Sequence, residues 1–271
     1  MGRGTWSWIV PDGLWEIAKP LIPPSRVRPQ GGGTQDTPDE TLFAAIVYVL
    51  VSGCAWRQLP PCFGISKSTA HRRFLIWSRA GVWGRLHEAV LHRLDDTGLI
   101  DVTRVVLDTA HVRAKRGEHT GPSPVDRGKP GSKMHILSDT NGLPLLVGIS
   151  AGNTHDSEGL KPTVAGHQTR HDPHRGRYLK PQRLHADKAY DRADLRKWLR
   201  GKRIGVRIAR KGIESSERLG HRRWVIERTM SWLSGYRRLS PHYERHSRNY
   251  LAFLGLAAAL CCYKHLDRLT T

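Results

Sequence analysis

The chain has few cysteines, and none of them is spaced for metal binding. Its 271 residues contain four cysteines, Cys54, Cys62, Cys261 and Cys262, without a C-x-x-C pair. The sequence therefore gives poor support to a zinc site or a disulfide framework. Packed thiols in a reducing compartment are the simplest interpretation.

Long hydrophobic runs are also missing. The longest apolar run, Leu251–Tyr263, has 13 residues, fewer than the roughly 20 that span a bilayer as a helix. The first residues, MGRGTWSWIVPDG, lack the apolar segment of a signal peptide. Gly128-Lys129-Pro130 lacks the upstream glycine and the Ser or Thr of a Walker A motif. We expect a soluble cytoplasmic chain, associated with the bacterial nucleoid, with no membrane partner and no nucleotide cofactor.

Acidic residues are scarce relative to basic ones. The chain carries 44 Lys and Arg against 24 Asp and Glu, a formal net charge of +20. Residues 1–100 hold 11 basic and 8 acidic side chains, whereas residues 101–271 hold 33 and 16. Such a field favours a polyanionic partner, and the second part of the chain would meet most of it.

Residues 1–98 are predicted to form an all-α unit. Helices are expected over Gly13–Leu21, Pro38–Ser52 and Val82–Leu94, with another beginning near Ser66. The helix after Ser66 resembles the recognition helix of a helix-turn-helix, because its first turns are polar while Phe74 and Trp77 can pack inward. The candidate DNA contacts on it are Lys67, Ser68, Thr69, His71, Arg72 and Arg73. The alternative is an amphipathic helix with a solvated basic face.

Residues 99–271 change to a strand period. β-branched or apolar runs at Val102–Asp108, Lys133–Ser138 and Leu143–Ser150 predict three strands, with a hairpin turn at Asn141-Gly142. Strands and helices then alternate to the C-terminus. Three antiparallel strands followed by this alternation predict an RNase H-like α/β fold, a mixed sheet with flanking helices. Two basic loops, Arg113–Ser132 and Thr169–Gln182, are either solvated connectors or clamps on a phosphate backbone.

Three acidic residues in this basic half are candidates for chemistry. Asp108 is expected to end the first strand and Asp187 a later one, while Glu227 lies on a helix that begins near Arg222. On that helix Glu227 shares a face with Arg223 and Trp224 and is expected to face the sheet. Three converging carboxylates are the oxygen ligands that two Mg²⁺ ions need for phosphoryl displacement. The alternative is that each acid pairs with a neighbouring arginine on the surface.

Several motifs together resemble the DDE transposases of bacterial insertion sequences, in particular the insertion-sequence-five family. The similarity covers nearly the whole chain, from Trp6–Gly53 and Cys54-Ala-Trp56-Arg57-Gln-Leu-Pro60 in the first unit to the second unit. The second-unit motifs are Val106-Leu-Asp108-Thr-Ala-His111-Val-Arg113-Ala-Lys115-Arg116-Gly117, Thr120–Lys133, Ala151-Gly-Asn-Thr-His155-Asp156, Ala186-Asp187-Lys-Ala-Tyr-Asp191 and Arg223-Trp-Val-Ile-Glu227-Arg-Thr.

The resemblance implies that Asp108, Asp187 and Glu227 form the metal-binding catalytic triad, with two Mg²⁺ ions that Mn²⁺ can replace. It also implies a Tyr-Arg-Glu-Lys signature around the last acid. Here only part of it is present, because Gly220 stands in the place of the Tyr and Ser234 in that of the Lys.

The expected activity is that of a DNA transposase, which binds terminal inverted repeats, cleaves the DNA ends and transfers them to target DNA. The expected partners are double-stranded DNA and a second copy of the chain, because two transposon ends must be joined. Further candidate DNA contacts are Arg113, Lys115, Arg116, Lys129, Lys133, Lys188, Arg222, Arg223, Arg237 and Arg238.

Two other functions compete with this interpretation. Gly148-Ile-Ser150-Ala-Gly152 matches the G-x-S-x-G motif of serine hydrolases. A DNA-binding regulator derived from a transposase, without cleavage activity, is the alternative from a different class. His155 and Asp156 either assist the site or cap a loop, and His111 is expected to point to the face opposite Asp108.

Overall fold

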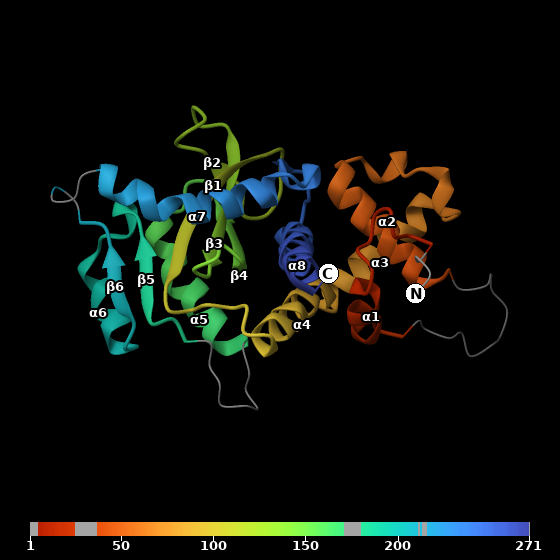
Figure 1. Cartoon of the computed structure of the whole chain (residues 1–271). Coiled ribbons are helices and arrows are strands. Elements are labelled where there is room, and N and C mark those ends of the chain that lie inside the picture. Colours follow the sequence, from red (N-terminus) through yellow and green to blue (C-terminus); the bar gives the residue numbers. More distant parts are fainter. Residues whose placement is uncertain (1–4, 25–36, 171–179, 211, 213–215, 271) are drawn as a thin grey trace.

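The computed structural model describes residues 5–24, 37–170, 180–210, 212 and 216–270. The side chains of residues 168–170, 216–223 and 268–270 lie outside this description. Two parts are visible in Figure 1, a group of helices built from the N-terminal residues and a sheet flanked by helices.

The predicted N-terminal helices are present. They are α1 (Leu14–Ala18) with η1 (Lys19–Leu21), α2 (Asp39–Ser52), α3 (Lys67–Arg79) and α4 (Val82–Asp96). The Ser66 hydroxyl accepts a 3.0 Å hydrogen bond from the Thr69 backbone N–H and so caps α3. The connection from α2 to α3 spans residues 53–66 and contains η2 (Trp56–Gln58) and η3 (Pro61–Phe63). It is much longer than the three- or four-residue turn of a compact helix-turn-helix.

The strands form one mixed sheet. The main order is β4 (Pro144–Ala151), β3 (Pro130–Ser138), β1 (Val105–Ala114), β5 (Arg183–Ala186) and β6 (Gly205–Ile208). β4, β3 and β1 pair antiparallel, whereas β1, β5 and β6 run parallel. Two short strands, β2 (Gly121–Pro122) and β7 (Pro241–His242), pair with the start of β3 and with the end of β1. This order and these directions are those of the RNase H-like fold, as predicted.

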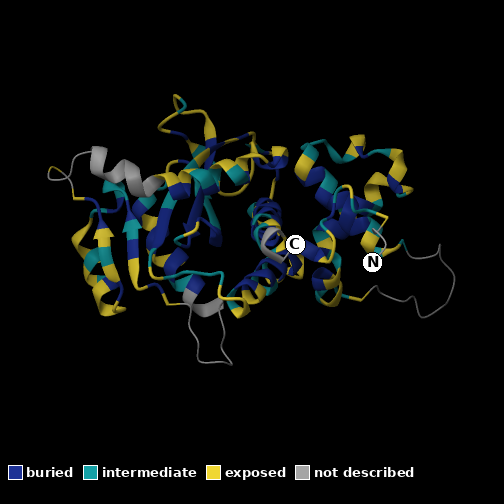
Figure 2. Cartoon of the chain, viewed as in Figure 1, coloured by how far each residue is buried: buried dark blue, intermediate teal, exposed yellow. Residues whose placement is uncertain are grey.

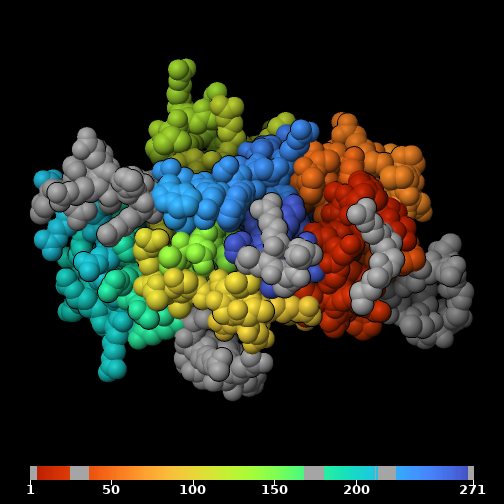
Figure 3. Space-filling model, viewed as in Figure 1, coloured from red at the N-terminus to blue at the C-terminus, as the bar shows by residue number. Residues whose placement is uncertain are grey.

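The first strand differs from the prediction. β1 begins at Val105 and continues to Ala114, so Asp108 lies within the strand and does not end it. Its second half pairs with β3 as far as Arg113↔Gly131. The basic loop predicted from Arg113 therefore shrinks to a protrusion of residues 115–129 between β1 and β3, which we call the arm; it stands out at the top of Figures 1 and 3.

The β3–β4 turn is built around a buried carboxylate. Asp139 accepts hydrogen bonds from the backbone N–H groups of Asn141, Leu143 and Asp101. Gly142 has φ +85°, a conformation that costs little only for glycine. The Asn-Gly hairpin predicted from the sequence is confirmed, and Asp139 supplies the contacts that fix it.

Helices cover both faces of the sheet. α5 (Leu160–Arg170) packs on β3 and β4, and α7 (Ser216–Ser234) packs on β1 and β3. On α8 (Ser247–Thr270), the Tyr250 hydroxyl contacts the Met134 sulfur, which places α8 on the same face as Met134. α6 (Ala193–Gly201) lies beside β6, and short 3-10 turns occur at η4 (Asp156–Gly159), η5 (Lys188–Tyr190) and η6 (Arg237–Leu239).

The last helix joins the two parts of the molecule. α8 packs against α2, α3 and α4 on one side and against β4 and α7 on the other. Phe253 of α8 stacks on Phe74 of α3 with ring centroids 4.3 Å apart. Buried residues form one continuous core along the strands and α8 (Figure 2). The division at residues 98 and 99 stays a prediction, and the N-terminal helices share their core with a C-terminal helix. None of the described helices is long and apolar enough to cross a membrane.

We expect Phe253→Ala to lower the stability of both parts together. Its side chain is fully buried, and truncating such a phenylalanine costs about 3–5 kcal/mol. Guanidinium denaturation, followed by tryptophan fluorescence and far-UV circular dichroism, should show one transition at a lower midpoint. The matched control is Leu251→Ala on the exposed side of α8, which should cost much less. Two separate transitions, only one of them shifted, would contradict a shared core.

Candidate active site

Two of the predicted acids are brought together by the β1–β5 pairing. Val105 pairs with Leu184 and Val106 with His185 in parallel register. Two residues further along both segments are Asp108 and Asp187, so the register places these half-buried side chains next to each other at the carboxyl end of β5. Sequence alone identifies both residues, but their proximity depends on the non-local pairing of β1 with β5.

Each carboxylate is oriented by a neighbouring backbone N–H. Asp108 Oδ1 accepts a 2.8 Å hydrogen bond from Thr109 N, and Asp187 Oδ1 accepts one of 2.8 Å from Ala189 N at the start of η5. Asp108 is opposite Ile136 in the β1–β3 ladder, two residues from Met134 on β3. Because alternate residues of a strand share a face, we place Asp108 on the α7 and α8 face of the sheet.

Tyr190 lies among the acids of this region. Its side chain is fully buried, and burial raises its pKa, as do the negative charges of Asp108, Asp156 and Asp187. Its hydroxyl lies near that of Thr109 but makes no hydrogen bond of good geometry within the described structure. The phenol is therefore neutral and shares its surroundings with three carboxylates.

A third carboxylate near Tyr190 belongs to Asp156. Its Oδ1 accepts a 2.6 Å hydrogen bond from Lys133 Nζ, which also donates to the Thr154 carbonyl at 2.7 Å. Burial tends to raise the pKa of Asp156, but hydrogen bonds and charge from Lys133 and a hydrogen bond from Thr109 hold it below its usual value. The sequence leaves Asp156 undecided between assisting the site and capping a loop.

Glu227 is less clearly placed in the site. It lies on α7, on the same face of the sheet as Asp108. The sequence predicts that its side chain faces the sheet, but in the structure the side chain is exposed. Trp224 is also 52% exposed and stacks on Arg228. The helix itself is anchored, since the Thr229 hydroxyl donates a 2.6 Å hydrogen bond to the Gly142 carbonyl. The role of Glu227 stays a prediction.

The donors present fit a divalent cation in part. Asp108 and Asp187 offer adjacent, half-buried carboxylate oxygens, the ligand type that Mg²⁺ and Mn²⁺ prefer. Within the described part of the chain, however, no group of three or more His, Cys, Asp or Glu side chains is arranged to hold a metal. Two carboxylates are adjacent, and a third donor would have to approach them to complete a metal site.

The predicted DNA contacts divide by exposure. Exposed side chains are Lys67, Ser68, Arg72, Arg113, Lys115, Arg116, Lys129 and Arg237. Partly buried ones are Thr69, His71 and Lys188. The backbone of Arg222 and Arg223 lies in α7, but their side chains are outside the described residues. These assignments stay predictions.

Three of the predicted DNA contacts, Arg73, Lys133 and Arg238, have buried side chains, which disfavours a direct contact with DNA. Arg73 is 7% exposed in the helical core. Arg238 donates to Glu244 at 3.0 and 2.5 Å and to the Cys54 carbonyl at 3.0 Å, which ties η6 to the N-terminal helices. The Lys133 side chain is 6% exposed and is held by Asp156. In a single sequence, a buried cation looks the same as a surface one.

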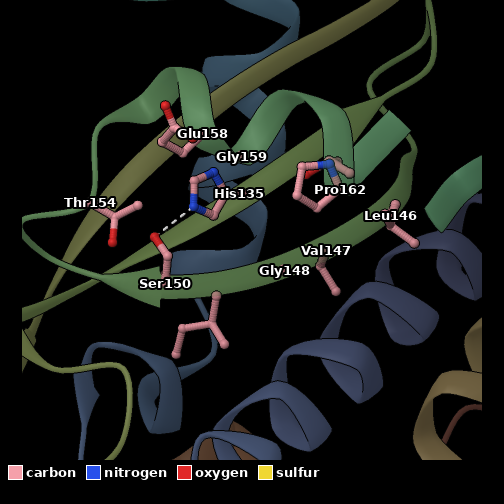
Figure 4. A pocket seen from close by; sticks show the side chains of 11 residues that line it. His135, Leu146, Val147, Gly148, Ser150, Thr154, Glu158, Gly159 and Pro162 are labelled. Carbon is pink, nitrogen blue, oxygen red and sulfur yellow. Dashed lines mark hydrogen bonds between the residues drawn. The ribbon is translucent and has the colours of Figure 1, made fainter. Parts of the chain in front are cut away.

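The serine hydrolase motif does not have the required geometry. Ser150 lies within β4, and a nucleophile elbow needs a sharp turn from strand to helix. Its hydroxyl does contact His135 Nε2 at 2.7 Å, beside a cavity of about 270 Å³ (Figure 4). Yet His135 Nδ1 has no hydrogen-bond partner in the described structure and faces Gly159 so closely that a Cβ there would clash with the ring. None of the described acids orients this imidazole, so the pair is not a catalytic triad.

Family profiles match both parts of the chain. A profile described as "Transposase DDE domain" matches residues 92–262, and one described as "Putative transposase of IS4/5 family" matches residues 10–87. The chain belongs to the DDE transposase family. The resemblance inferred from the sequence motifs is therefore confirmed.

Two curated relatives come from Burkholderia cepacia. The chain is 38% identical to "Putative transposase for insertion sequence element IS402" over 149 residues, 55% of this chain and 71% of the relative. It is 35% identical to "Insertion element IS402 uncharacterized 16.2 kDa protein" over 119 residues, 43% of this chain and 81% of the relative.

Similar solved structures include transposases of low sequence identity. The catalytic domain of Mos1 mariner transposase is 12% identical with a TM-score of 0.31, covering 68% of this chain and 91% of that one. A pre-cleavage Mos1 transpososome is 13% identical with a TM-score of 0.29, covering 89% and 82%.

His135 should make this transposase-family chain sensitive to mild acid. The pKa of His135 is lowered to about 4, mainly by burial; the charge of Asp156 opposes this shift and that of Lys133 contributes to it. The unfolded chain binds this proton near pH 6.5. Stability should therefore be fully present above pH 6.5 and fall towards pH 4, by about 3 kcal/mol from this residue alone.

Urea denaturation at several pH values checks this expectation. His135→Gln should flatten the stability profile between pH 6.5 and 4, whereas His92→Gln, an exposed control on α4, should leave it unchanged. A profile as steep in His135→Gln as in the wild type would contradict the assignment.

Proposed function

We propose that the chain is a DNA transposase that binds the terminal inverted repeats of an insertion sequence, cleaves the DNA at each end and transfers the ends to target DNA. The observation that carries the proposal is the pairing of β1 with β5, which sets Asp108 beside Asp187 in a DDE-family chain with the RNase H strand order. Adjacent carboxylates supply the oxygen ligands that divalent cations use in phosphodiester chemistry.

The metal ligands would be Asp108 and Asp187, with Glu227 approaching from α7. When bound, two Mg²⁺ or Mn²⁺ ions supply the positive charge that activates an attacking oxygen and stabilises the leaving oxygen of an in-line displacement. The chain contributes orientation, because Thr109 N and Ala189 N each fix one carboxylate. Exchange of one phosphodiester for another requires no external energy source, which agrees with the lack of a Walker A motif.

The arm offers a basic surface for the DNA backbone. Its exposed cations include Lys115, Arg116 and Lys129, and Lys115 also lies 5.4 Å from the centre of the Tyr243 ring. Glu118 fastens the arm to the start of α8 by accepting hydrogen bonds from the Ser247 backbone and hydroxyl. A fastened arm presents its charges in a fixed arrangement, which favours positioning of phosphates.

The exposed start of α3 would contact the inverted repeats. Lys67, Ser68 and Arg72 are exposed there, and the positive end of the helix dipole favours phosphate. Because two ends must be joined in one reaction, we propose that the active species is at least a dimer assembled on DNA.

Loss of the Asp187 or the Glu227 carboxylate should abolish cleavage while DNA binding remains. We expect Asp187→Asn and Glu227→Gln to eliminate metal-dependent cuts in a duplex that carries the DNA flanking this gene. Cleavage is measured in Mg²⁺ and in EDTA, and binding by fluorescence anisotropy. Asp194→Asn, an exposed acid on α6, is the control that should cleave as wild type does.

Equal cleavage by wild type and Glu227→Gln would remove Glu227 from the site. Binding by the wild type without any cut in Mg²⁺ or Mn²⁺ would favour the regulator that lacks cleavage activity.

Charge removal from the arm should weaken binding in a salt-dependent way. Removing one cation that touches a phosphate reduces the slope of log K against log [salt] by about 1. We expect Arg116→Ala and Lys129→Ala each to lower affinity at about 0.1 M salt and to reduce this slope. Arg200→Ala, an exposed cation on α6, is the matched control. An unchanged slope in both arm variants would exclude the arm from the DNA interface.

A further inference from the structure

A largely buried ion pair lies on the face of the sheet opposite to Asp108. The Lys133 and Asp156 side chains are 6% and 25% exposed, and Lys133 Nζ lies 2.6 Å from Asp156 Oδ1. We call them the Lys133–Asp156 pair. Lys133 is on β3, opposite His111 of β1, and Asp156 begins η4. Because Lys133 alternates with Met134 along β3, the pair lies on the sheet face opposite to the one that bears Asp108.

Stability alone is a weak reason for such a pair. Removing a lysine ammonium and a carboxylate from water costs several kcal/mol per ion, and apolar residues of similar volume often stabilise a core as well or better. Lys133 also donates a hydrogen bond to the Thr154 carbonyl. The position of the pair, rather than its strength, therefore needs an explanation.

The pair is connected to Asp108 through one residue. The Thr109 side chain lies on the same sheet face as Lys133 and interacts with the Asp156 carboxylate, whose pKa it lowers. The Thr109 backbone N–H donates to Asp108 Oδ1 at 2.8 Å. Consecutive strand residues point to opposite faces. Thr109 thus links a carboxylate on the η4 face to the Asp108 carboxylate on the α7 face.

The pair is also connected to the Asp187 side of the site. Tyr190 ends the short turn that Asp187 caps. Its buried hydroxyl lies near Thr109, and the negative charge of Asp156 raises the pKa of this hydroxyl. Asp156 thereby adds a third negative charge near Asp108 and Asp187. Lys133 is in hydrogen-bond contact with that charge and offsets it.

We propose that the Lys133–Asp156 pair is a positioning device for the proposed metal site: Asp156 holds Thr109, and with it Asp108, while Lys133 balances the negative charge that Asp156 brings. This inference rests on the proposed function. Both residues should therefore affect cation affinity and cleavage rate, which a purely structural ion pair would not do.

Cation affinity gives the first test, independent of activity. Calorimetry with Mn²⁺ alone should show weaker binding by Asp156→Asn, because a negative charge is removed, and tighter binding by Lys133→Met, because a positive charge is removed. Each shift should be on the order of 10-fold. Asp187→Asn should abolish binding at the site. The matched control is Asp194→Asn, which breaks the exposed ion pairs of Asp194 with Lys161 and Arg192 and should leave Mn²⁺ affinity unchanged.

Single-turnover cleavage of the flanking-DNA duplex gives the second test. Asp156→Asn should cleave about 10–100-fold more slowly with unchanged DNA affinity. The double variant Lys133→Met/Asp156→Asn should recover thermal stability, because no charge of the pair is left buried without its partner, but its cleavage should stay slow. If Asp156→Asn does not fold, Thr109→Val removes the connecting hydroxyl and should slow cleavage in the same direction.

Three outcomes would overturn the proposal. One is wild-type Mn²⁺ affinity in both single variants. Another is a shift of the same sign in both. The third is full recovery of cleavage in the double variant, which would leave the pair a structural role only. If the wild type binds Mn²⁺ but cuts no DNA, the proposed function fails, while the affinity shifts still decide the role of the pair.

Discussion

The structure depends on the parallel pairing of β1 with β5. These strands are far apart in the sequence, yet their register alone sets Asp108 beside Asp187. It also brings Tyr190, which follows β5, next to Thr109 of β1. A slip of one residue would turn one of the two carboxylates to the opposite face of the sheet. The buried strand residues Val105 and Leu184 specify the register, so the hydrophobic core determines the geometry of the site.

A second constraint is the position of α8. Because this helix packs on both the sheet and the N-terminal helices, α3 and the strands that bear the acids are held in one body. The segment before α8 adds to this, since Arg238 reaches Cys54 in the N-terminal part and Glu118 of the arm reaches Ser247. DNA bound at α3 and at the arm would therefore be held in a defined position relative to Asp108 and Asp187.

Most elements can be predicted from local pattern, and most errors come from tertiary contacts. The Ser66 cap, the Asn141-Gly142 turn and the three antiparallel strands follow from short-range sequence signals. The continuation of β1 past Asp108 does not, because its second half is specified by pairing with Gly131–His135 of β3 and not by an apolar run. Lys133 looks like a surface residue for a similar reason, since its partner Asp156 is 23 residues away in the sequence. Tyr190, the buried phenol among the acids, gives no signal beyond its place in the Asp187 motif.

The central claim is that Asp108 and Asp187 hold a divalent cation. Its most direct test is hydroxyl-radical cleavage of the polypeptide by Fe²⁺ bound in place of Mg²⁺, with the fragments mapped by mass spectrometry. The account predicts backbone cuts close to residues 108 and 187, suppressed by excess Mg²⁺ and absent in Asp187→Asn. Cuts confined to other parts of the chain, or no localised cuts at all, would contradict it.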